Sequence, residues 1–193
     1  MTTKAHIHTH KKTAIIVGAL ILAAYAVMIS AIFESLIIGM LIEVFSGVAV
    51  IAIPFLMFPL LKPYNRQVTL GYLVCRIIEG AALIITGLLL LSSSPALLGI
   101  RDWIGVYHAY IFIPAALMFY YVLYQSKLIP RFISVWGVLA LIALFIVNVL
   151  EITGRSSAIA NVLYLPIITN EVFLAFWLFV KGFNASAIVS RTA

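Results

Sequence analysis

Cysteine is nearly absent from this chain, since Cys75 is the only one among 193 residues. A single thiol cannot form an internal disulfide, a thiolate metal cluster or a CxxC redox pair. Catalytic motifs are also lacking, because no HExxH, GxSxG or phosphate-binding glycine loop occurs. There is no Glu-x-x-His pair for a di-iron bundle, and only His108 lies within an apolar run, which excludes bis-histidine haem ligation. We therefore expect no cofactor.

Charge is scarce as well. Only 9% of the residues are charged, 65% are hydrophobic and the mean hydropathy is +1.20, which excludes an ordinary soluble domain. The apolar runs are continuous and do not alternate, so a porin-like barrel is excluded too. The formal net charge is +6, but the basic residues flank apolar runs and form no patch. Nucleic acid is therefore not an expected partner, whereas membrane lipid is.

The apolar runs predict an all-α integral membrane bundle of six transmembrane helices, at about 20 residues per crossing. The first run continues past Ala24-Tyr25-Ala26, which resembles a cleavage site, so we interpret it as a retained helix and not as a signal peptide. Ser92 to Asp102 is expected to be a loop. A single domain should cover residues 13–182, between polar tails at 1–12 and 183–193. The expected helices are 13–33, 36–61, 68–92, 103–125, 132–152 and 158–180.

Basic residues are distributed unequally between the two sides of this arrangement. One side would hold only Arg101 and Arg155. The positive-inside rule therefore predicts that the other side, with both termini, is cytoplasmic. No internal repeat is evident, so the sequence does not favour an inverted-repeat transporter. The residues on the cytoplasmic side would be Lys4, Lys11, Lys12, Lys62, Arg66, Lys127, Arg131, Lys181 and Arg191.

The N-terminal tail carries histidines at alternate positions, His6, His8 and His10. In an extended chain this spacing could gather a divalent metal ion. The simpler interpretation is a flexible tail with incidental metal affinity, because tails are usually disordered unless they are tied down. We predict no dedicated metal site.

Two charges lie in the middle of the third predicted helix, Arg76 and Glu79. A charge at the bilayer centre costs about 2.5–3.5 kcal/mol on the insertion scale unless the protein pairs it. At about 1.5 Å per residue, Arg76 lies about 12 Å deep, Glu79 about 16 Å and Glu171 of the last helix about 15 Å. We therefore predict a polar cluster of Arg76, Glu79 and Glu171, with Asn170 nearby. It could be a packing clasp or a functional site.

A second, looser group is predicted nearer the opposite side of the membrane. Glu43, His108 and Asn148 each lie within roughly 6–11 Å of a helix end by the same rise. Prolines in three predicted helices are expected to kink them and to shape a cavity. These prolines are Pro54, Pro114 and Pro166.

Several blocks of the sequence resemble a known family. FPLLKPYN is followed by LGYLVCRIIEG, RDW, LIPRFISVWG and LPIITNEVFLAFWLFVKGFN. Together, between Lys11 and Asn184, they resemble the prokaryotic multi-pass membrane proteins of the domain-of-unknown-function family 4386. The histidine-rich tail and the short loop after the third helix depart from the family's pattern. The resemblance implies a protein of the prokaryotic cytoplasmic membrane and brings no activity with it. The family-like blocks contain Arg76, Glu79, Arg101, Asp102, Pro130, Arg131, Asn170 and Glu171.

Three hypotheses for function follow. The first is a binding, sensory or accessory protein whose cavity holds a lipid or a small amphiphile, with Arg76 pairing an acidic head group or an internal glutamate. The second is a proton- or ion-coupled carrier in which Glu79 or Glu171 changes protonation. The third, an intramembrane enzyme, would use Glu43 and His108 and is the least favoured. We prefer the first. Carriers usually alternate between two conformations by moving one structural repeat against another, and these short helices show neither repeats nor a chain of carboxylates.

Overall fold

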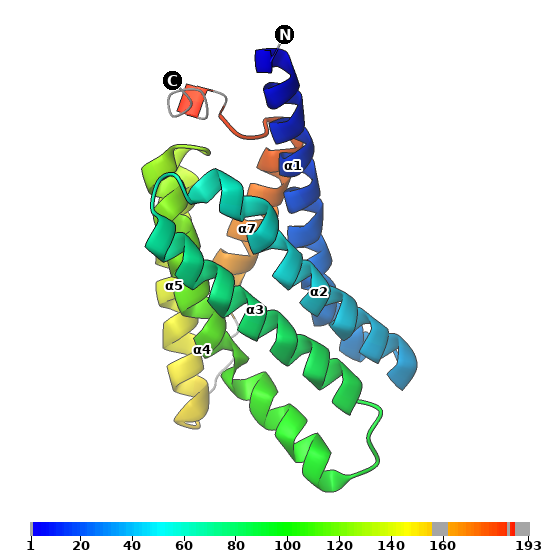
Figure 1. The fold of residues 1–193 in the computed structure, drawn as a ribbon. Coiled ribbons are helices and arrows are strands. Elements are labelled where there is room, and N and C mark those ends of the chain that lie inside the picture. Colours follow the sequence, from blue (N-terminus) through cyan, green and yellow to red (C-terminus); the bar gives the residue numbers. More distant parts are fainter. Residues whose placement is uncertain (1, 156–161, 185, 188–193) are drawn as a thin grey trace.

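The computed structural model describes residues 2–155, 162–184 and 186–187, and this part of the chain contains helices and no strand. The predicted all-α fold class is therefore confirmed. The elements in order are α1 (Thr2–Ala24), the 3₁₀ segment η1 (Tyr25–Ile32), α2 (Leu36–Leu61), α3 (Arg66–Leu89), α4 (Pro95–Ser126), α5 (Arg131–Ile152) and α7 (Leu165–Val180), as Figure 1 shows.

The helices have the lengths and surfaces of membrane helices. Large apolar side chains lie on the outside of the bundle; for example, Leu139 is 62% exposed and Val180 is 71% exposed. Such a surface is unfavourable in water and favourable in lipid. The chain is a multi-pass membrane protein. Besides α7, an apolar helix of 16 residues, five segments are long and apolar enough to cross a bilayer: His10–Ile29, Leu36–Leu61, Arg66–Leu89, Pro95–Ser126 and Arg131–Ile152.

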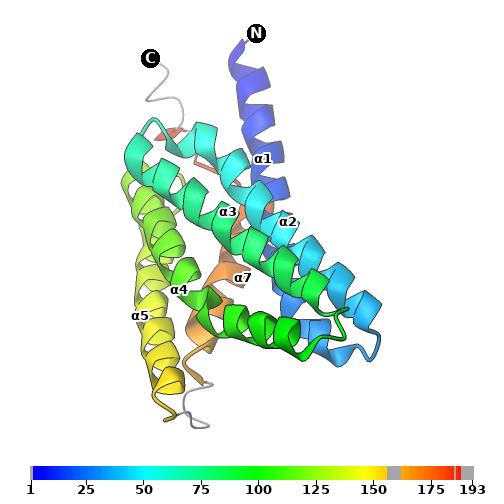
Figure 2. The same ribbon diagram turned by 60° about the horizontal axis from the view of Figure 1, so that its bottom comes forward.

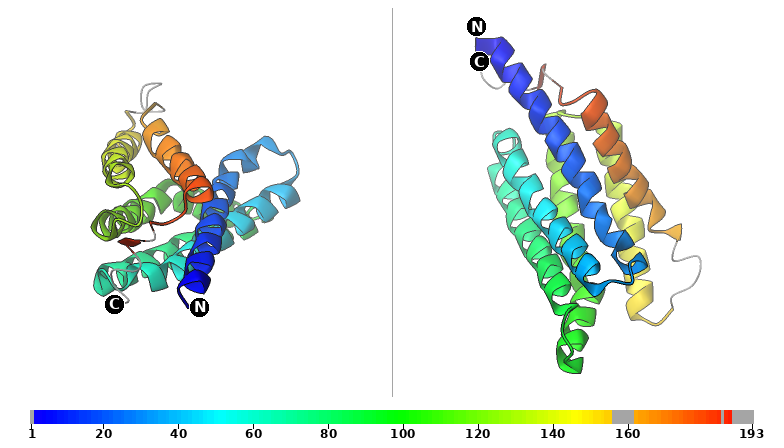
Figure 3. Two further views of the ribbon diagram at one scale, coloured as in Figure 1. Left: turned by 90° about the horizontal axis from the view of Figure 1, so that it is seen from above. Right: turned by 90° about the vertical axis from the view of Figure 1, so that its right-hand side faces the viewer.

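The helices close into a ring. Neighbours along the chain pack against each other from α1 to α5, and α7 completes the ring by packing against both α5 and α1, as the view from above in Figure 3 shows. The start of α1 and the end of α7 lie at the same end of the bundle, together with the α2–α3 and α4–α5 turns (Figure 1). We call this the terminal end, and the opposite one the distal end.

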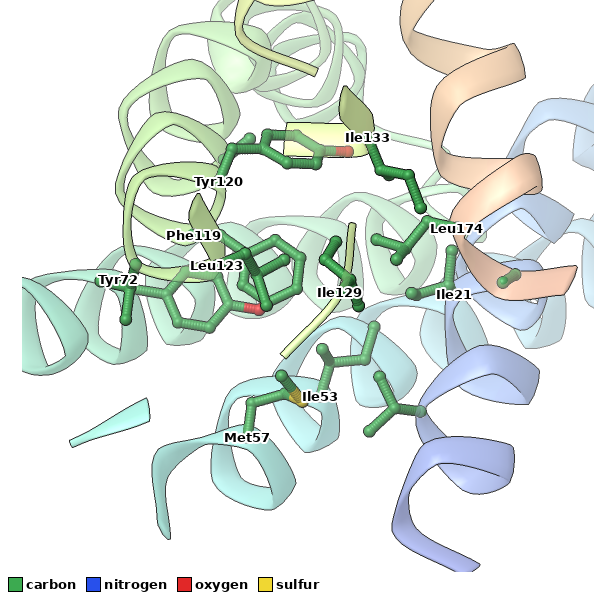
Figure 4. Packing of buried hydrophobic residues seen from close by; sticks show 14 of the residues in the cluster. Ile21, Ile53, Met57, Tyr72, Phe119, Tyr120, Leu123, Ile129, Ile133 and Leu174 are labelled. Atoms are coloured by element: carbon green, nitrogen blue, oxygen red, sulfur yellow. The ribbon is translucent and has the colours of Figure 1, made fainter. Parts of the chain in front are cut away.

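Apolar side chains fill the ring most densely towards its terminal end. Figure 4 shows Met57 of α2, Tyr72 of α3 and Phe119 of α4 around a shared centre, which Ile129 and Leu174 also reach. All five are at most 4% exposed. The rings of Tyr72 and Phe119 are stacked with centroids 5.0 Å apart. This half of the bundle interior is therefore closed by packed side chains.

The closest approach between helices is between α2 and α3. Gly47 and Gly80 face each other there, and a Cβ atom added at Gly80 would lie only 2.6 Å from the carbonyl oxygen of Gly47. Small residues at such crossings let helix backbones approach each other within a membrane. The two glycines thus set the distance at which α3 presents its polar face to the interior.

Helix α4 bends part of the way along its length, and its first half runs beneath the distal end of α3 in Figure 2. Pro114 lies inside this helix and removes one backbone hydrogen bond, which is the usual cause of a kink. The bend carries Arg101 away from α5 and towards α2.

The structure corrects the expected start of α4. Residues 92–102 were expected to form a loop, with a helix from Trp103, but the helix begins at Pro95 with Ser94 as its N-cap residue. Proline at the first helical position loses no hydrogen bond and is favoured there, so Pro95 starts a helix and does not mark a loop. Arg101 and Asp102 are consequently helical residues.

The N-terminal segment is also different from the expectation. Thr2–Lys12 belongs to α1 and is not an extended tail. A polar segment that continues an existing helix avoids the cost of nucleation. Of the three histidines considered for a metal, the side chains of His6 and His8 lie outside the described residues. In the described part of the chain no group of metal-ligating residues is found.

At the other end of the chain, the last helix is shorter than expected. It was expected over residues 158–180, of which 158–161 lie outside the described residues, and α7 begins at Leu165. Pro166 lies in its first turn, where it can start a helix without a kink. Of the expected tail 183–193, residues 185 and 188–193 lie outside the described part.

Candidate functional site

Arg76 and Glu79 form a buried ion pair on α3. The helix starts at an N-cap residue, Asn65, whose side chain accepts a hydrogen bond from the Val68 amide. Three residues apart on this helix, Arg76 and Glu79 share one face, and they are 6% and 2% exposed. Nη1 of Arg76 donates to both Oε1 and Oε2 of Glu79 at 3.1 Å. Each charge therefore has its first partner within its own helix.

Aromatic rings surround the other side of the Arg76 guanidinium. Its carbon lies 5.8 Å from the ring centroid of Tyr72 and 5.1 Å from that of Phe112 on α4. A cation over aromatic faces gains about 2 kcal/mol or more when desolvated. Between Glu79 and the two rings, the positive charge of Arg76 is largely compensated by the protein itself.

Glu171 of α7 lines the same cavity as Arg76 and Glu79. It is 8% exposed, and Tyr25 lines the same cavity. No ion pair within 4.0 Å joins Glu171 to a basic group among the described residues, although the charge of Arg76 acts on it across the cavity. Glu171 thus shares a cavity with Arg76 and Glu79 but forms no ion pair with Arg76.

Asn170 has a different position. Its side-chain Nδ2 donates to the carbonyl oxygen of Ile133 on α5 at 3.0 Å, and it is fully buried. Adjacent residues of a helix point about 100° apart, and here Glu171 lines the cavity whereas Asn170 points towards α5. Asn170 holds α7 against α5 and does not line the cavity.

The cavity inside the ring has a volume of about 240 Å³. Apolar side chains form much of its wall, and its polar lining comes from residues far apart in the sequence. It combines a mostly apolar wall with a few convergent polar groups, as ligand sites usually do. The polar and ionisable residues around it are Tyr25, Arg76, Glu79, His108, Asn148, Glu151, Tyr164 and Glu171.

The three residues of the second predicted group do not form one network. Oε1 of Glu43 accepts from Arg101 Nη2 at 2.7 Å, whereas His108 Nε2 lies 3.9 Å from Oε1 of Glu79. Asn148 donates to the Leu144 carbonyl of its own helix at 2.7 Å. Instead of a separate cluster, His108 joins the inner site and Glu43 joins Arg101.

A second cavity, of about 570 Å³, adjoins the first on its distal side. It is lined by Glu43, Arg101 and Asp102, and it shares His108 and Glu151 with the inner cavity. The side chain of Asp102 is 77% exposed. The outer cavity therefore forms a polar entrance at the distal end of the bundle that shares part of its lining with the inner cavity.

Three functional candidates were missed by sequence reasoning. Arg101 was expected in a loop, and no role was predicted for Glu151. Glu151 is exposed, lines both cavities and accepts a hydrogen bond from Tyr164 at 2.8 Å. Burial and this bond raise the pKa of the Tyr164 hydroxyl to about 12, so it remains a neutral donor. The third, Tyr25, could have been found, because a tyrosine well inside an apolar run departs from the usual interfacial position.

Comparisons with known proteins agree with the resemblance seen in the sequence. Residues 13–182 match a family described as a domain of unknown function (DUF4386). No curated protein and no solved structure is significantly similar to the chain. The matched range contains the helices that form the ring, apart from the first residues of α1, and every residue of the inner cavity. The chain therefore belongs to the DUF4386 family.

Proposed function

We propose that this protein binds a small amphiphile within the membrane, and that the head group of the ligand donates hydrogen bonds or carries a positive charge. The inner cavity supports this proposal by its size. A water molecule in the liquid occupies about 30 Å³, so about 240 Å³ accommodates a small head group together with the first carbons of its chain.

The charge balance of the cavity favours a basic head group. The charge of Arg76 is paired with Glu79 through Nη1 and covered by two rings, although its buried Nε has no hydrogen-bond partner in the described part of the chain. Of the three carboxylates that line the cavity, Glu151 and Glu171 have no basic partner among the described residues, and only Glu171 of these two is buried. The buried Glu171 is the observation that carries the proposal. An uncompensated buried carboxylate is unfavourable, and a ligand that brings a cation or a donor would relieve this cost.

A matched pair of probes tests the proposal. Octylamine and octanoate have the same chain length and opposite charges at neutral pH. Native mass spectrometry of the protein released from nanodiscs should show octylamine adducts in preference to octanoate adducts. Glu171→Gln should weaken octylamine binding by about tenfold or more, because a charge-assisted hydrogen bond is replaced by a neutral one.

Glu34→Gln is the control for this experiment, since Glu34 is an exposed acid outside both cavities. It should leave the octylamine adducts unchanged. A preference for octanoate, or octylamine binding that survives in Glu171→Gln, would contradict the proposal.

A proton-coupled carrier is the second candidate. It is favoured by the 3.9 Å approach of His108 to Glu79 and by the polar entrance from the distal end. Against it, the apolar cluster around Tyr72 and Phe119 closes the terminal half, whereas alternating access needs a path on both sides. In proteoliposomes with an internal pH dye, a carrier should show proton flux that Glu79→Gln and Glu171→Gln abolish. Absence of flux in the wild type and in both variants would remove this candidate.

The arrangement gives the enzyme hypothesis little support. Glu43 is held by Arg101 and His108 lies beside Glu79, and no ion pair joins Glu43 to His108 in the described part of the chain. A general base must lie within hydrogen-bonding reach of the proton that it abstracts. We do not propose a catalytic role for this pair.

A further inference from the structure

A separate cavity lies at the terminal end of the bundle, away from the inner site. Its volume is about 510 Å³, and it is formed by the α4–α5 turn, the end of α7 and the segment that follows α7. Its lining includes three basic side chains, those of Lys127, Arg131 and Lys181, together with Trp177.

The turns that form this cavity are tied to each other. The Asn184 amide donates to the Leu128 carbonyl at 2.8 Å, and the Asn184 side chain donates to the Lys127 carbonyl at 3.4 Å. Lys127, at φ 54°, and Gly182, at φ 70°, end their helices in the left-handed conformation that reverses the chain direction. Leu128 and Ile129 are buried beneath the turn. The cavity is thus a defined part of the fold.

Among the described residues, no acidic side chain lies against the basic groups of this cavity. The sequence has six acidic residues, and none of them lines it. Arg131 is oriented by the Tyr124 ring, with its guanidinium carbon 4.6 Å from the ring centroid, and its Nε donates to the Tyr124 carbonyl. The planar guanidinium keeps further N–H groups for an anion. These groups therefore surround a space suited to a phosphate.

An aromatic surface continues from the cavity along the outside of α5 and α7. Trp177 lines the cavity and also lies 6.5 Å from Phe132 and 6.4 Å from Phe173, measured between ring centroids. Phe132 is 54% exposed and Phe173 is 38% exposed, on the face where lipid chains run. Basic groups at the membrane boundary with apolar rings below them match the two parts of a phospholipid.

We propose that this cavity binds the phosphate head group of an anionic phospholipid, whose acyl chains lie on the rings of Phe132, Phe173 and Trp177. Lys127, Arg131 and Lys181 contact the head group. The positive-inside rule predicts that this end is cytoplasmic, where anionic lipids create a negative surface.

The test uses the full chain in nanodiscs that contain equal amounts of dioleoylphosphatidylglycerol and dioleoylphosphatidylcholine, which differ in head group and share their chains. Native mass spectrometry should show retained phosphatidylglycerol in excess. Lys127→Gln/Lys181→Gln should lower that excess by about tenfold to thirtyfold, since each basic residue near an anionic surface contributes up to about fivefold. Both lysines are exposed, so the melting temperature should stay at the wild-type value.

Lys11→Gln/Lys12→Gln is the matched control. These lysines are exposed at the same end of the bundle and removing them changes the net charge equally, but they do not line the cavity. The control should keep the phosphatidylglycerol excess. An equal loss in both variants would show general attraction to the surface and overturn the proposal. A lysine-dependent adduct with inorganic phosphate alone, at the affinity of the lipid, would indicate a free-anion site and would also overturn it.

Discussion

Replacing Arg76 with leucine is expected to destabilise the protein by about 3–5 kcal/mol, because Glu79 would remain buried without its partner. Glu79 is 2% exposed and accepts both of its ion-pair hydrogen bonds from Arg76. The variant should unfold at a lower temperature in detergent and give less monodisperse protein. Thermal unfolding followed by circular dichroism measures the loss.

Two further variants distinguish the effect of breaking the ion pair from the effect of removing any charge. Arg66→Leu changes an exposed arginine of the same helix and should shift the melting temperature little. Arg76→Leu/Glu79→Leu removes both charges and should recover most of the stability, since replacing a whole buried pair by apolar residues is often neutral. If Arg76→Leu were as stable as Arg66→Leu, Arg76 and Glu79 would not form the buried pair described above.

Substitution of Gly80 with valine is expected to have the second large effect, by forcing α2 and α3 apart. Even the first atom of the new side chain would lie 2.6 Å from the Gly47 carbonyl oxygen and 2.5 Å from Cγ1 of Ile51. Ile51 can change rotamer, but the backbone oxygen of α2 cannot move without the helix. Overpacking usually costs about 1–3 kcal/mol and occasionally more, and we expect the upper part of this range here.

Gly99 and Gly105 provide the controls, because a Cβ added at either position meets no atom within 4 Å. Gly105→Ala lies in the interior of α4 and should leave the melting temperature unchanged or raise it slightly, since alanine is the better helix former. Gly80→Val with the same melting temperature as Gly105→Ala would contradict the close packing of α2 on α3.

The membrane helices were largely predictable because their signals are strong and local. Leu36–Leu61 is helical over the same residues as the apolar run in the sequence, and α3 and α5 each begin within two residues of the predicted start. Each of these runs is continuous and is followed or preceded by a basic turn. Burial in lipid makes every backbone group bond within its own helix, so an apolar run of this length has only one good conformation.

The site was harder to predict because it depends on which helices are neighbours. Counting depth placed Arg76, Glu79 and Glu171 in one layer, and the structure has all three at one cavity. The depth of a residue in the membrane does not show which way its side chain points around the helix axis. Asn170 was therefore grouped with Glu171, although the Asn170 side chain faces α5. Arg101 forms an ion pair with Glu43 because α4 begins at Pro95, earlier than predicted, and because the helix bends. Neither feature is apparent from the pattern of apolar residues.

The 3₁₀ segment after α1 has a consequence for the inner cavity. Eight residues advance about 16 Å as a 3₁₀ helix and about 12 Å as an α-helix, so η1 extends the first crossing by about 4 Å. Tyr25, Val27 and Met28 of this stretched segment form part of the cavity wall. A 3₁₀ turn has poorer hydrogen bonds than an α-turn, and its rewinding would shorten and rotate this wall. Part of the cavity wall is thus built from backbone with the poorer hydrogen bonds of a 3₁₀ helix, which changes its pitch more easily than an α-helix does.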